Sequence, residues 1–489
     1  MKTRSLRPRA LRAFAFLLAL ALTGCASTPA RKYYPASDAL LPGTEPVMNA
    51  PGFWISRHQA PDALILDEAG IAELNARIRE KKLVRDLATW VPPSVEELNE
   101  DIEGAFRWVA GLRVYERSGR RVGNHFLEPL REAVSRGEKF AKARYGFLAR
   151  KADLRALPTD APLFDGPGDP AIDNLQASSL EAGTALVIQA TTGDGAWLYV
   201  TGERASGWVR EERVAFASRE AFLDRYLKPG TLTVIAARAE LWENPERTRL
   251  AYPVRMGARL VPAEAQAAGD EGSREATPAE NPSTVVPVLM PERDSAGNLY
   301  ERLLWASRAD VVEGFLPFSA RTVYVEAFRL LNAPYGWGGS FGEQDCSQFL
   351  CEIFSTVGLT LPRNSSKQAK AGIPVRGFPE TGRDDAAARE SLLSGNALPG
   401  ATLLRLPGHI MLYLGSVSGK PYAIHATFGY REKGAFRERV RLVNRVVVST
   451  LDLGKGSSVG SHLERLTDAT VLGIDAGICP VTEGGITLR

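Results

Sequence analysis

Hydrophobic and polar residues follow different rhythms along the 489-residue chain, and each rhythm predicts a different structure. Over residues 53–150 the apolar positions recur as on one face of a helix, which predicts helices at 71–83 and 95–112. Ser94 and Glu97 fit the capping box with which many helices begin. From about residue 151 short runs of β-forming residues alternate with turn residues, so a β region follows the helical one.

The β region divides into two parts. In the first part, strands are expected at 185–189, 197–200 and 207–209. Asp194-Gly195 is typical of a tight hairpin turn, and the segments GTALVI, DGAWLYV and GWV together resemble a bacterial SH3-like barrel. The second part is interpreted as another such barrel, with strands expected at 231–236, 254–260 and 302–305. Residues 263–284 interrupt it and are rich in Ala, Glu, Gly and Pro, which predicts a disordered insertion.

The C-terminal residues combine both rhythms. A helix is expected at 320–331, and a glycine-dense stretch follows at 332–342. Another helix is expected at 345–357, because Asp345 suits an N-cap and Gly358 suits a helix end. Two strand-like runs come later, at 408–415 and 421–427.

The first 25 residues have the pattern of a targeting segment. Basic residues precede an apolar run at 13–22, which is too short to span a membrane because spanning takes about 20 residues. The run ends in Leu-Thr-Gly-Cys25, which resembles a bacterial lipobox and implies cleavage before Cys25 and lipidation of its thiol. Ala26 after the cysteine favours the periplasmic face of the outer membrane. An ordinary signal peptide with a chance cysteine is the alternative.

Charge narrows the possible partners. The formal charge is +3, but five basic residues lie before Cys25, and without them 55 basic residues face 57 acidic ones. A nucleic-acid-binding protein would keep its basic excess in the folded part, so this class is disfavoured. The chain contains no C-x-x-C motif and its 5 histidines are scattered, so a metal site has little support.

Cys346 is the candidate nucleophile. It falls at the first position of the expected helix, where unpaired N–H groups and the helix dipole would lower the pKa of the thiol. Cys351 lies inside the same helix and is expected to be an inert, buried side chain. Cys479 is either free or paired with Cys351.

A thiolate nucleophile needs a base, and His409 and His425 lie in the two strand-like runs. If these runs form a hairpin with a short loop at 416–418, Gly415 faces Gly419 and His409 lies directly opposite His425. One imidazole could then orient the other, as in a catalytic triad. The alternative is a buried cysteine with two unrelated strand histidines.

Five motifs occur in a fixed order in the C-terminal region: Y-x-W-G-G at 335–339, D-C-S-x-F at 345–349, L-P-R-x-S-x-x-Q at 361–368, G-H-x-x-x-Y-L-G at 408–415 and I-H-A at 424–426. This series resembles the NlpC-type papain-like cell-wall peptidases. The phrase GFWISR at 52–57 resembles the stabilising N-terminal clip of their lipoprotein members.

The resemblance implies roles for individual residues. Cys346 would be the nucleophile, His409 the general base and His425 the residue that orients it. Tyr335 would lie near the oxyanion, and Asp345 and Ser347 would contact the oxyanion or the substrate. Asp173 and Gln176 lie in a segment that resembles one bordering the substrate groove of relatives. The two histidines are 16 positions apart, more than in common members of the family, so a longer hairpin is expected.

The sequence therefore predicts an α+β multidomain protein with a helical N-terminal segment, two SH3-like β-barrels and a C-terminal papain-like catalytic domain. The expected parts are a signal peptide at 1–24, a lipidated cysteine and tether at 25–50, a helical clip domain at 51–150, barrels at 151–220 and 221–318, and a peptidase domain at 319–489. It is expected to act as a monomer, without a cofactor, on peptidoglycan stem peptides.

The resemblance implies cleavage of the bond between the γ-carboxyl of D-glutamate and the diamino acid, through a thioester. Two rival hypotheses remain open. One is an inactive wall-binding scaffold, and the other is an acyltransferase or amidase that acts on another bond of the wall.

Overall fold

The computed structural model describes residues 40–167, 172–228, 230–263, 284–378, 386–434 and 436–473. The predicted signal peptide, Cys25, nearly all of the predicted insertion and Cys479 lie outside the described residues. Among the described helices, none has the length and apolar character needed to cross a membrane.

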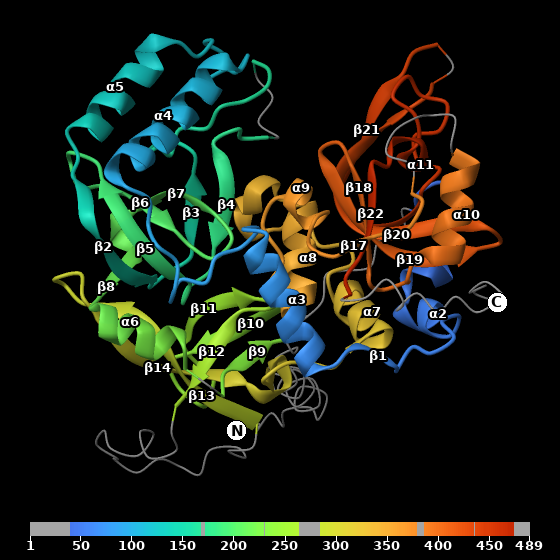
Figure 1. The fold of residues 1–489 in the computed structure, drawn as a ribbon, viewed down its shortest axis with the longest axis horizontal. Helices are drawn as coiled ribbons and strands as arrows, with labels where there is room; N and C mark the ends of the chain where they lie inside the picture. The colour runs from blue at the N-terminus through green and yellow to red at the C-terminus, as the bar shows by residue number, and fades with distance from the viewer. Residues whose placement is uncertain are drawn as a thin grey trace, which may run out of the picture.

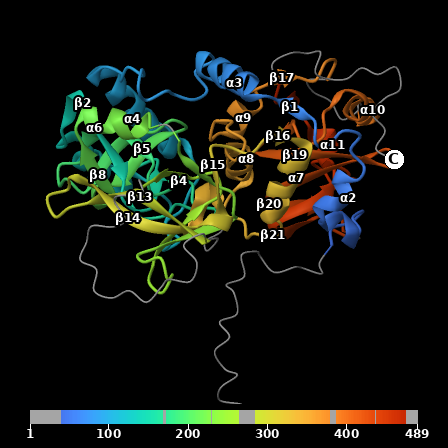
Figure 2. The ribbon, with the colours of Figure 1, turned by 90° about the horizontal axis from the view of Figure 1, so that it is seen from below.

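The chain folds into an α+β architecture in which two β domains lie beside a C-terminal α+β domain (Figure 1). Figure 2 shows the same arrangement from below, with α8 (Cys346–Ser355) and α9 (Ser365–Gln368) at the boundary between them. The multidomain α+β class expected from the sequence is confirmed.

The first β domain contains a seven-stranded sheet in the order β4-β3-β7-β6-β5-β2-β8. Its strands are β2 (Lys139–Leu148), β3 (Ala152–Arg155), β4 (Gln176–Leu180), β5 (Ala185–Thr191), β6 (Trp197–Thr201), β7 (Ser206–Arg210) and β8 (Val214–Ala217). Asp194 and Gly195 form the turn between β5 and β6, as expected, and Gly195 takes φ +71° there. Helices α4 (Val95–Gly111) and α5 (Asn124–Ser135) cover one end of this sheet and share a core with Trp197 and Trp208.

The second β domain contains a seven-stranded sheet in the order β11-β10-β14-β13-β12-β9-β15. Its strands are β9 (Leu232–Val234), β10 (Arg238–Trp242), β11 (Leu250–Arg255), β12 (Arg259–Pro262), β13 (Val285–Arg293), β14 (Leu299–Ser307) and β15 (Val311–Glu313), and α6 (Arg219–Tyr226) precedes them. The single strand predicted at 254–260 is wrong. Gly257 has φ +79° and lies against Ser355 of α8, so the backbone turns there and two strands result.

The predicted helical segment 51–150 packs into two different hydrophobic cores. Its C-terminal part, α4 and α5, packs on the first β domain, and the capping box of Ser94 and Glu97 is present at the start of α4. Its N-terminal part packs on the C-terminal domain instead. This part consists of η1 (Pro46–Asn49), α2 (Pro51–Ile55), β1 (Leu64–Leu66) and α3 (Glu68–Glu80).

The N-terminal part is joined to the C-terminal domain by backbone and side-chain contacts. Strand β1 pairs antiparallel with β16 (Phe318–Ser319). Trp54 is completely buried against Tyr422, and its Nε1 donates to the carbonyl of Met48. The segment is therefore built into the core of a domain more than 250 residues further along the chain.

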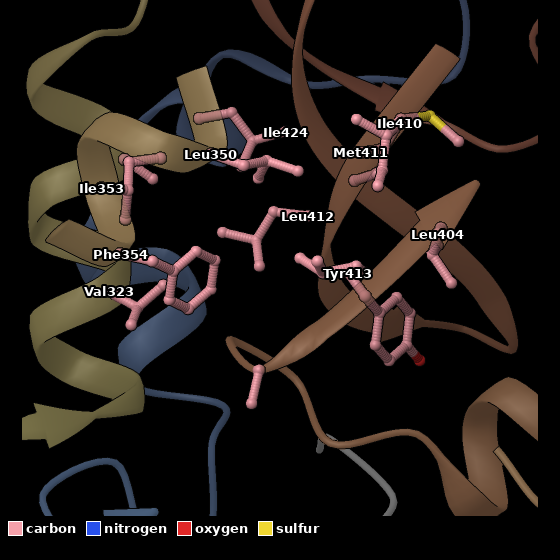
Figure 3. Packing of buried hydrophobic residues seen from close by; sticks show 14 of the residues in the cluster. Val323, Leu350, Ile353, Phe354, Leu404, Ile410, Met411, Leu412, Tyr413 and Ile424 are labelled. Carbon is pink, nitrogen blue, oxygen red and sulfur yellow. The ribbon is translucent and has the colours of Figure 1, made fainter. Parts of the chain in front are cut away.

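The C-terminal domain has a six-stranded sheet in the order β17-β22-β18-β19-β20-β21. Its strands are β17 (Ile373–Pro374), β18 (Thr402–Leu406), β19 (His409–Val417), β20 (Lys420–Glu432), β21 (Arg439–Thr450) and β22 (Asp468–Val471). Its other helices are α7 (Ala320–Arg329), α10 (Ala386–Asn396) and α11 (His462–Arg465). Figure 3 shows Leu350, Ile353 and Phe354 of α8 facing Leu412 and Ile424 of the sheet, and this packing fixes α8 against β19 and β20.

The β domains and the C-terminal domain enclose a cavity of about 630 Å³. Its lining includes Asn75 of α3, Glu203 of the first β domain, Thr231 of the second, and Gln348 and Glu352 of α8. Cys346 is not among the lining residues, so the cavity is distinct from the surroundings of the predicted nucleophile.

Candidate active site

Cys346 is the first residue of α8, as the sequence predicted. Asp345 caps this helix, and its Oδ1 accepts hydrogen bonds from the backbone N–H groups of Ser347 and Gln348 at 3.1 and 2.9 Å. The cap fixes where the helix begins, and it therefore fixes the place of the Cys346 side chain.

Asp345 is also held by Arg363 in a buried ion pair. Arg363 Nη1 donates to Oδ1 at 3.0 Å and Nη2 donates to Oδ2 at 2.5 Å. Burial alone would raise the pKa of Asp345, but the charge and hydrogen bonds of Arg363 outweigh it and hold this pKa below its ordinary value. The carboxylate is therefore ionised within the protein, and its contact with substrate stays a prediction.

Ser347 belongs to the same network. Its Oγ donates to Asp345 Oδ1 at 3.0 Å and accepts from Arg363 Nη1 at 2.7 Å, and Gln368 Nε2 donates to its carbonyl at 2.8 Å. Its expected role at the oxyanion or the substrate stays a prediction, because all of these contacts lie inside the protein. Cys351, four residues further on, is fully buried, and burial raises the pKa of its thiol, as expected for an inert side chain.

The glycine-dense stretch folds back on itself between Tyr335 and Asp345. Gly336 N–H donates to the carbonyl of Gln344 at 3.1 Å, and Gly338 N–H donates to Asp345 Oδ2 at 3.1 Å. Tyr335 is thereby brought beside Cys346, and burial together with the charge of a Cys346 thiolate would keep the phenol protonated by raising its pKa. Its ring packs on Phe428 at 6.1 Å.

His409 and His425 meet, as the sequence predicted. His409 Nε2 lies 2.7 Å from His425 Nδ1, a hydrogen-bond distance. The predicted register is wrong, because the hairpin closes with a two-residue turn at Ser418-Gly419, in which both residues have positive φ.

A bulge explains why the two histidines still meet. Val417 pairs with Lys420 at the turn, but a shift between Tyr413 and Gly415 makes Leu412 pair with Ile424. If this register continues, His425 lies opposite Met411. Met411 is two residues from His409, so His409 and His425 lie on the same face of the sheet. The contact is therefore diagonal, and imidazole rings are long enough to span it.

Two residues that the sequence did not indicate complete the surroundings of His425. Ser449 Oγ of β21 lies 2.9 Å from His425 Nε2. The ring of His462, on α11, lies 5.6 Å from that of His425 and 6.0 Å from that of His409. Neither Ser449 nor His462 belongs to a recognisable motif, so only the fold could reveal them.

The expected low pKa of Cys346 is wrong for this structure. Burial raises the pKa of the thiol to about 12, with a further contribution from the charge of Asp345. The backbone N–H of Ile410 and the charge of Arg363 lower the pKa of the thiol, as does the backbone N–H of Ser347 at the helix start, but burial outweighs all three. In this structure the thiol therefore keeps its proton until a base removes it.

His409 is suited to be that base. It directly precedes Ile410, whose N–H reaches the Cys346 thiol, and its Nε2 is engaged with His425. Burial lowers the pKa of His409 to about 4, with a contribution from the charge of Arg465. The imidazole is therefore neutral at ordinary pH, which is the form that accepts a proton.

Gln176 lies where the first β domain meets the C-terminal domain, and Asp173 precedes it in the same segment of the first β domain. Both accept hydrogen bonds from Arg155, and Gln176 Nε2 donates to the carbonyl of Gly338 at 3.4 Å. Gln176 thus supports the glycine-dense stretch beside Cys346, whereas a place in the substrate groove stays a prediction for both residues. In the described part of the chain, no group of three or more His, Cys, Asp or Glu side chains is arranged to hold a metal ion.

Comparison with known families identifies two regions of the chain. Residues 332–434 match the model of the NlpC/P60 family, and residues 162–210 match that of the SH3 domain (SH3b1 type). The C-terminal part of the chain is an NlpC/P60 domain. The NlpC/P60 match spans the cysteine and both histidines described above and supports a cell-wall cysteine peptidase.

One similar solved structure shares the fold over most of the chain. An NlpC/P60 endopeptidase from Photobacterium damselae subsp. piscicida superposes with a TM-score of 0.65 at 17% identity, covering 86% of this chain and 94% of that one. An NlpC/P60 family protein from Bacillus cereus ATCC 10987 gives a TM-score of 0.45 at 17% identity, covering 68% of this chain and 100% of that one. Comparison with curated proteins gives no match.

Proposed function

We propose that this protein is a peptidoglycan endopeptidase that cleaves the bond between the γ-carboxyl of D-glutamate and the diamino acid of stem peptides, with Cys346, His409 and His425 as its catalytic triad. The observation that carries the proposal is the 2.7 Å contact between the two imidazoles beside a thiol at a helix start. The NlpC/P60 match supports the substrate class.

Acylation begins with the neutral pair. The Cys346 sulfur attacks the scissile carbonyl carbon while its proton moves to Nδ1 of His409. The resulting imidazolium donates from Nε2 to His425 Nδ1, so His425 accepts the bond that orients the base. His409 then protonates the amine of the diamino acid, which leaves, and the γ-glutamyl group remains on sulfur as a thioester.

Deacylation repeats the proton transfers with water. His409 removes a proton from the water that attacks the thioester, and the Cys346 sulfur leaves and regains its proton. The backbone N–H of Cys346 and the hydroxyl of Tyr335 are suited to bind the oxyanion in both steps. The tautomer of His425 that this sequence needs carries its proton on Nε2, where Ser449 Oγ accepts it.

Product mass tests the proposal. Residues 26–489, the Cys346→Ala variant and the Cys351→Ala variant are incubated with intact peptidoglycan and with the free peptide L-Ala-γ-D-Glu-diaminopimelate. The wild type and Cys351→Ala are expected to release the products of cleavage after D-glutamate, and Cys346→Ala is expected to release none. Cys351 is the matched control, because it is a buried thiol on the same helix without a catalytic contact.

The other outcomes point to the rival functions. Absence of cleavage of either substrate, with binding to the wall retained, would indicate a wall-binding scaffold. Products of another mass would indicate an amidase or acyltransferase. Preference for the free peptide over intact wall would indicate recycling of released fragments.

We also propose that Cys25 carries a lipid that anchors the mature chain to the periplasmic face of the outer membrane. The lipobox-like sequence before Cys25 supports this. The full chain is expected to partition into the detergent phase of a Triton X-114 extract, and the Cys25→Ser variant into the aqueous phase. Equal partitioning of the two would overturn the anchor.

A further inference from the structure

Three histidines, rather than two, form one cluster, in which His425 and His462 are buried and His409 is half-buried. His462 is 4% exposed and its ring is tilted 45° to that of His409 and 77° to that of His425. It begins α11, where Ser461 and Glu464 form a capping box that fixes the backbone. The third ring is therefore held in place by its own element, independently of β19 and β20.

The chemistry of His462 is not that of a simple packing residue. Its Nδ1 is buried and has no hydrogen-bond partner among the described residues. An unpartnered buried polar atom costs free energy, and an apolar side chain of similar size would fill the same space without that cost. A polar ring at this place therefore needs another reason.

The charges around the cluster suggest that reason. Arg465 of α11 faces His409 and disfavours a positive charge on it, whereas Asp345 at the start of α8 favours one. Arg389 of α10 reaches the same helix through the carbonyl of Glu464. His409 and His425 are hydrogen-bonded to each other, and His425 is also hydrogen-bonded to Ser449. All three side chains are uncharged as long as Cys346 keeps its proton. The imidazolium formed during catalysis is thus favoured by the charge of Asp345 and opposed by that of Arg465, and the groups in hydrogen-bond contact with the pair are neutral.

We propose that His462 is a positioning residue of the active site, whose neutral ring holds the His409–His425 pair in orientation and directs a nitrogen lone pair toward the positive charge that His409 gains. This inference rests on the proposed function of that pair. His462 itself takes no proton: the proton passes from the Cys346 sulfur to His409 and then to the leaving amine. The effect is electrostatic and acts through His409 and His425.

Two variants of similar size separate this role from packing. Both His462→Asn and His462→Leu remove the ring, but only Asn keeps a polar atom near the position of Nδ1. With the stem peptide as substrate, kcat is expected to fall about 10- to 100-fold in His462→Leu and much less in His462→Asn, with KM nearly unchanged in both. Thermal unfolding of both variants shows whether the fold is kept, and if Leu does not fold, His462→Phe replaces it.

A second readout does not depend on the substrate. In a Cys351→Ala background, the rate of alkylation of Cys346 by iodoacetamide is measured against pH from the mass of the peptide that carries it. Alkylation of the Leu variant is expected to be slower than that of the Asn variant, and its pH dependence is expected to be displaced. Equal kcat values and equal alkylation profiles for Asn and Leu would overturn the proposal. A wild type that alkylates in a His462-dependent way but cleaves no stem peptide would refute the proposed substrate and leave the role of His462 standing.

Discussion

The protonation states of the reacting side chains are set by their burial. Burial lowers the pKa of His409 from 6.5 to about 4, and the neutral form that accepts the thiol proton dominates above that value. We therefore expect kcat/KM to stay constant as the pH falls through 6.5 and to decline only near pH 4. The measurement is a pH profile of peptide cleavage at low substrate concentration.

The Arg465→Gln variant provides the control for this profile. Removing that charge takes away a cause of the lowered pKa of His409, so the acid limb is expected to move toward pH 6.5. Folding must be followed at each pH. Because the pKa values of His409, His425 and His462 are lowered in the folded protein, the unfolded chain binds more protons below pH 6.5 and stability declines as the pH falls. An acid limb near 6.5 in the wild type would contradict the prediction.

The ion pair of Asp345 and Arg363 is a second prediction at this scale. Both side chains are buried, so Arg363→Met leaves a carboxylate without its cation, and a loss of about 3–5 kcal/mol in unfolding free energy is expected. The control is Arg321→Met, which breaks the exposed pair with Asp62 and is expected to change stability little. Urea unfolding followed by tryptophan fluorescence measures both. Equal losses of unfolding free energy in the two variants would show that burial does not determine how much an ion pair contributes to stability.

The residue types of the site could be predicted from the sequence, but their surroundings could not. Cys346, His409 and His425 were recognisable because their motifs are local. The raised pKa of Cys346 was missed, because a helix position is visible in the sequence whereas burial by other elements is not. His462 was missed for the same reason, since α11 reaches the two histidines only through the folding of the sheet.

At the scale of elements, the glycine-dense stretch depends on the first β domain. Gly338 has φ +60°, and a Cβ there would lie 2.4 Å from the carbonyl oxygen of Gln176. Gly338→Ala is therefore expected to push the stretch away from β4 and to lower kcat/KM by moving Tyr335 relative to Cys346. Steady-state cleavage of the stem peptide measures the change.

Gly195 offers a matched control for this substitution. It has φ +71°, but no atom lies within 4 Å of a Cβ placed there. Gly195→Ala should cost only the backbone strain, about 1–2 kcal/mol, and leave kcat/KM unchanged. If both alanines affected cleavage equally, the contact between the stretch and β4 would not matter for catalysis.

The hairpin of β19 and β20 illustrates what periodicity can and cannot predict. The two apolar runs at 408–415 and 421–427 indicated both strands, and the assumed hairpin register put the two histidines on one face. The turn and the bulge at Leu414 could not be predicted, because they depend on local φ values and not on hydrophobicity. The shorter turn shifts the register by an odd number of residues, and the bulge shifts it by one residue. His409 and His425 therefore still lie on the same face, as the simple hairpin assumed.

At the scale of the whole molecule, the N-terminal segment stabilises the catalytic domain. Trp54 is fully buried between α7 and the sheet, and its removal is expected to cost about 3–5 kcal/mol of unfolding free energy. The control is Trp108→Ala, because that side chain is 48% exposed and faces solvent on α4. Urea unfolding of the two variants compares them, and similar midpoints would contradict the role of the segment as part of this core.

The division of the helical region between two cores was beyond the sequence. Its periodicity predicted the helices themselves, and α4 begins where the capping box placed it. The pattern of residues 51–150 did not indicate which apolar face would pack on which domain, because the apolar face of an amphipathic helix does not specify the surface that it packs against. That information is contained in the complementary surfaces of Tyr422, Phe318 and Trp208, far away in the sequence.

The pairing of β1 with β16 also affects how the protein is made. Synthesis releases the N-terminal segment first, but its partners in the C-terminal domain emerge only after both β domains have left the ribosome. The β domains have all their described strands by residue 313 and can fold early, whereas the core that Trp54 enters also needs β20 and, as the last strand of the described sheet, β22. A growing chain therefore passes through a stage with finished β domains and no assembled C-terminal sheet, and activity of the C-terminal domain can begin only after β22 has been made.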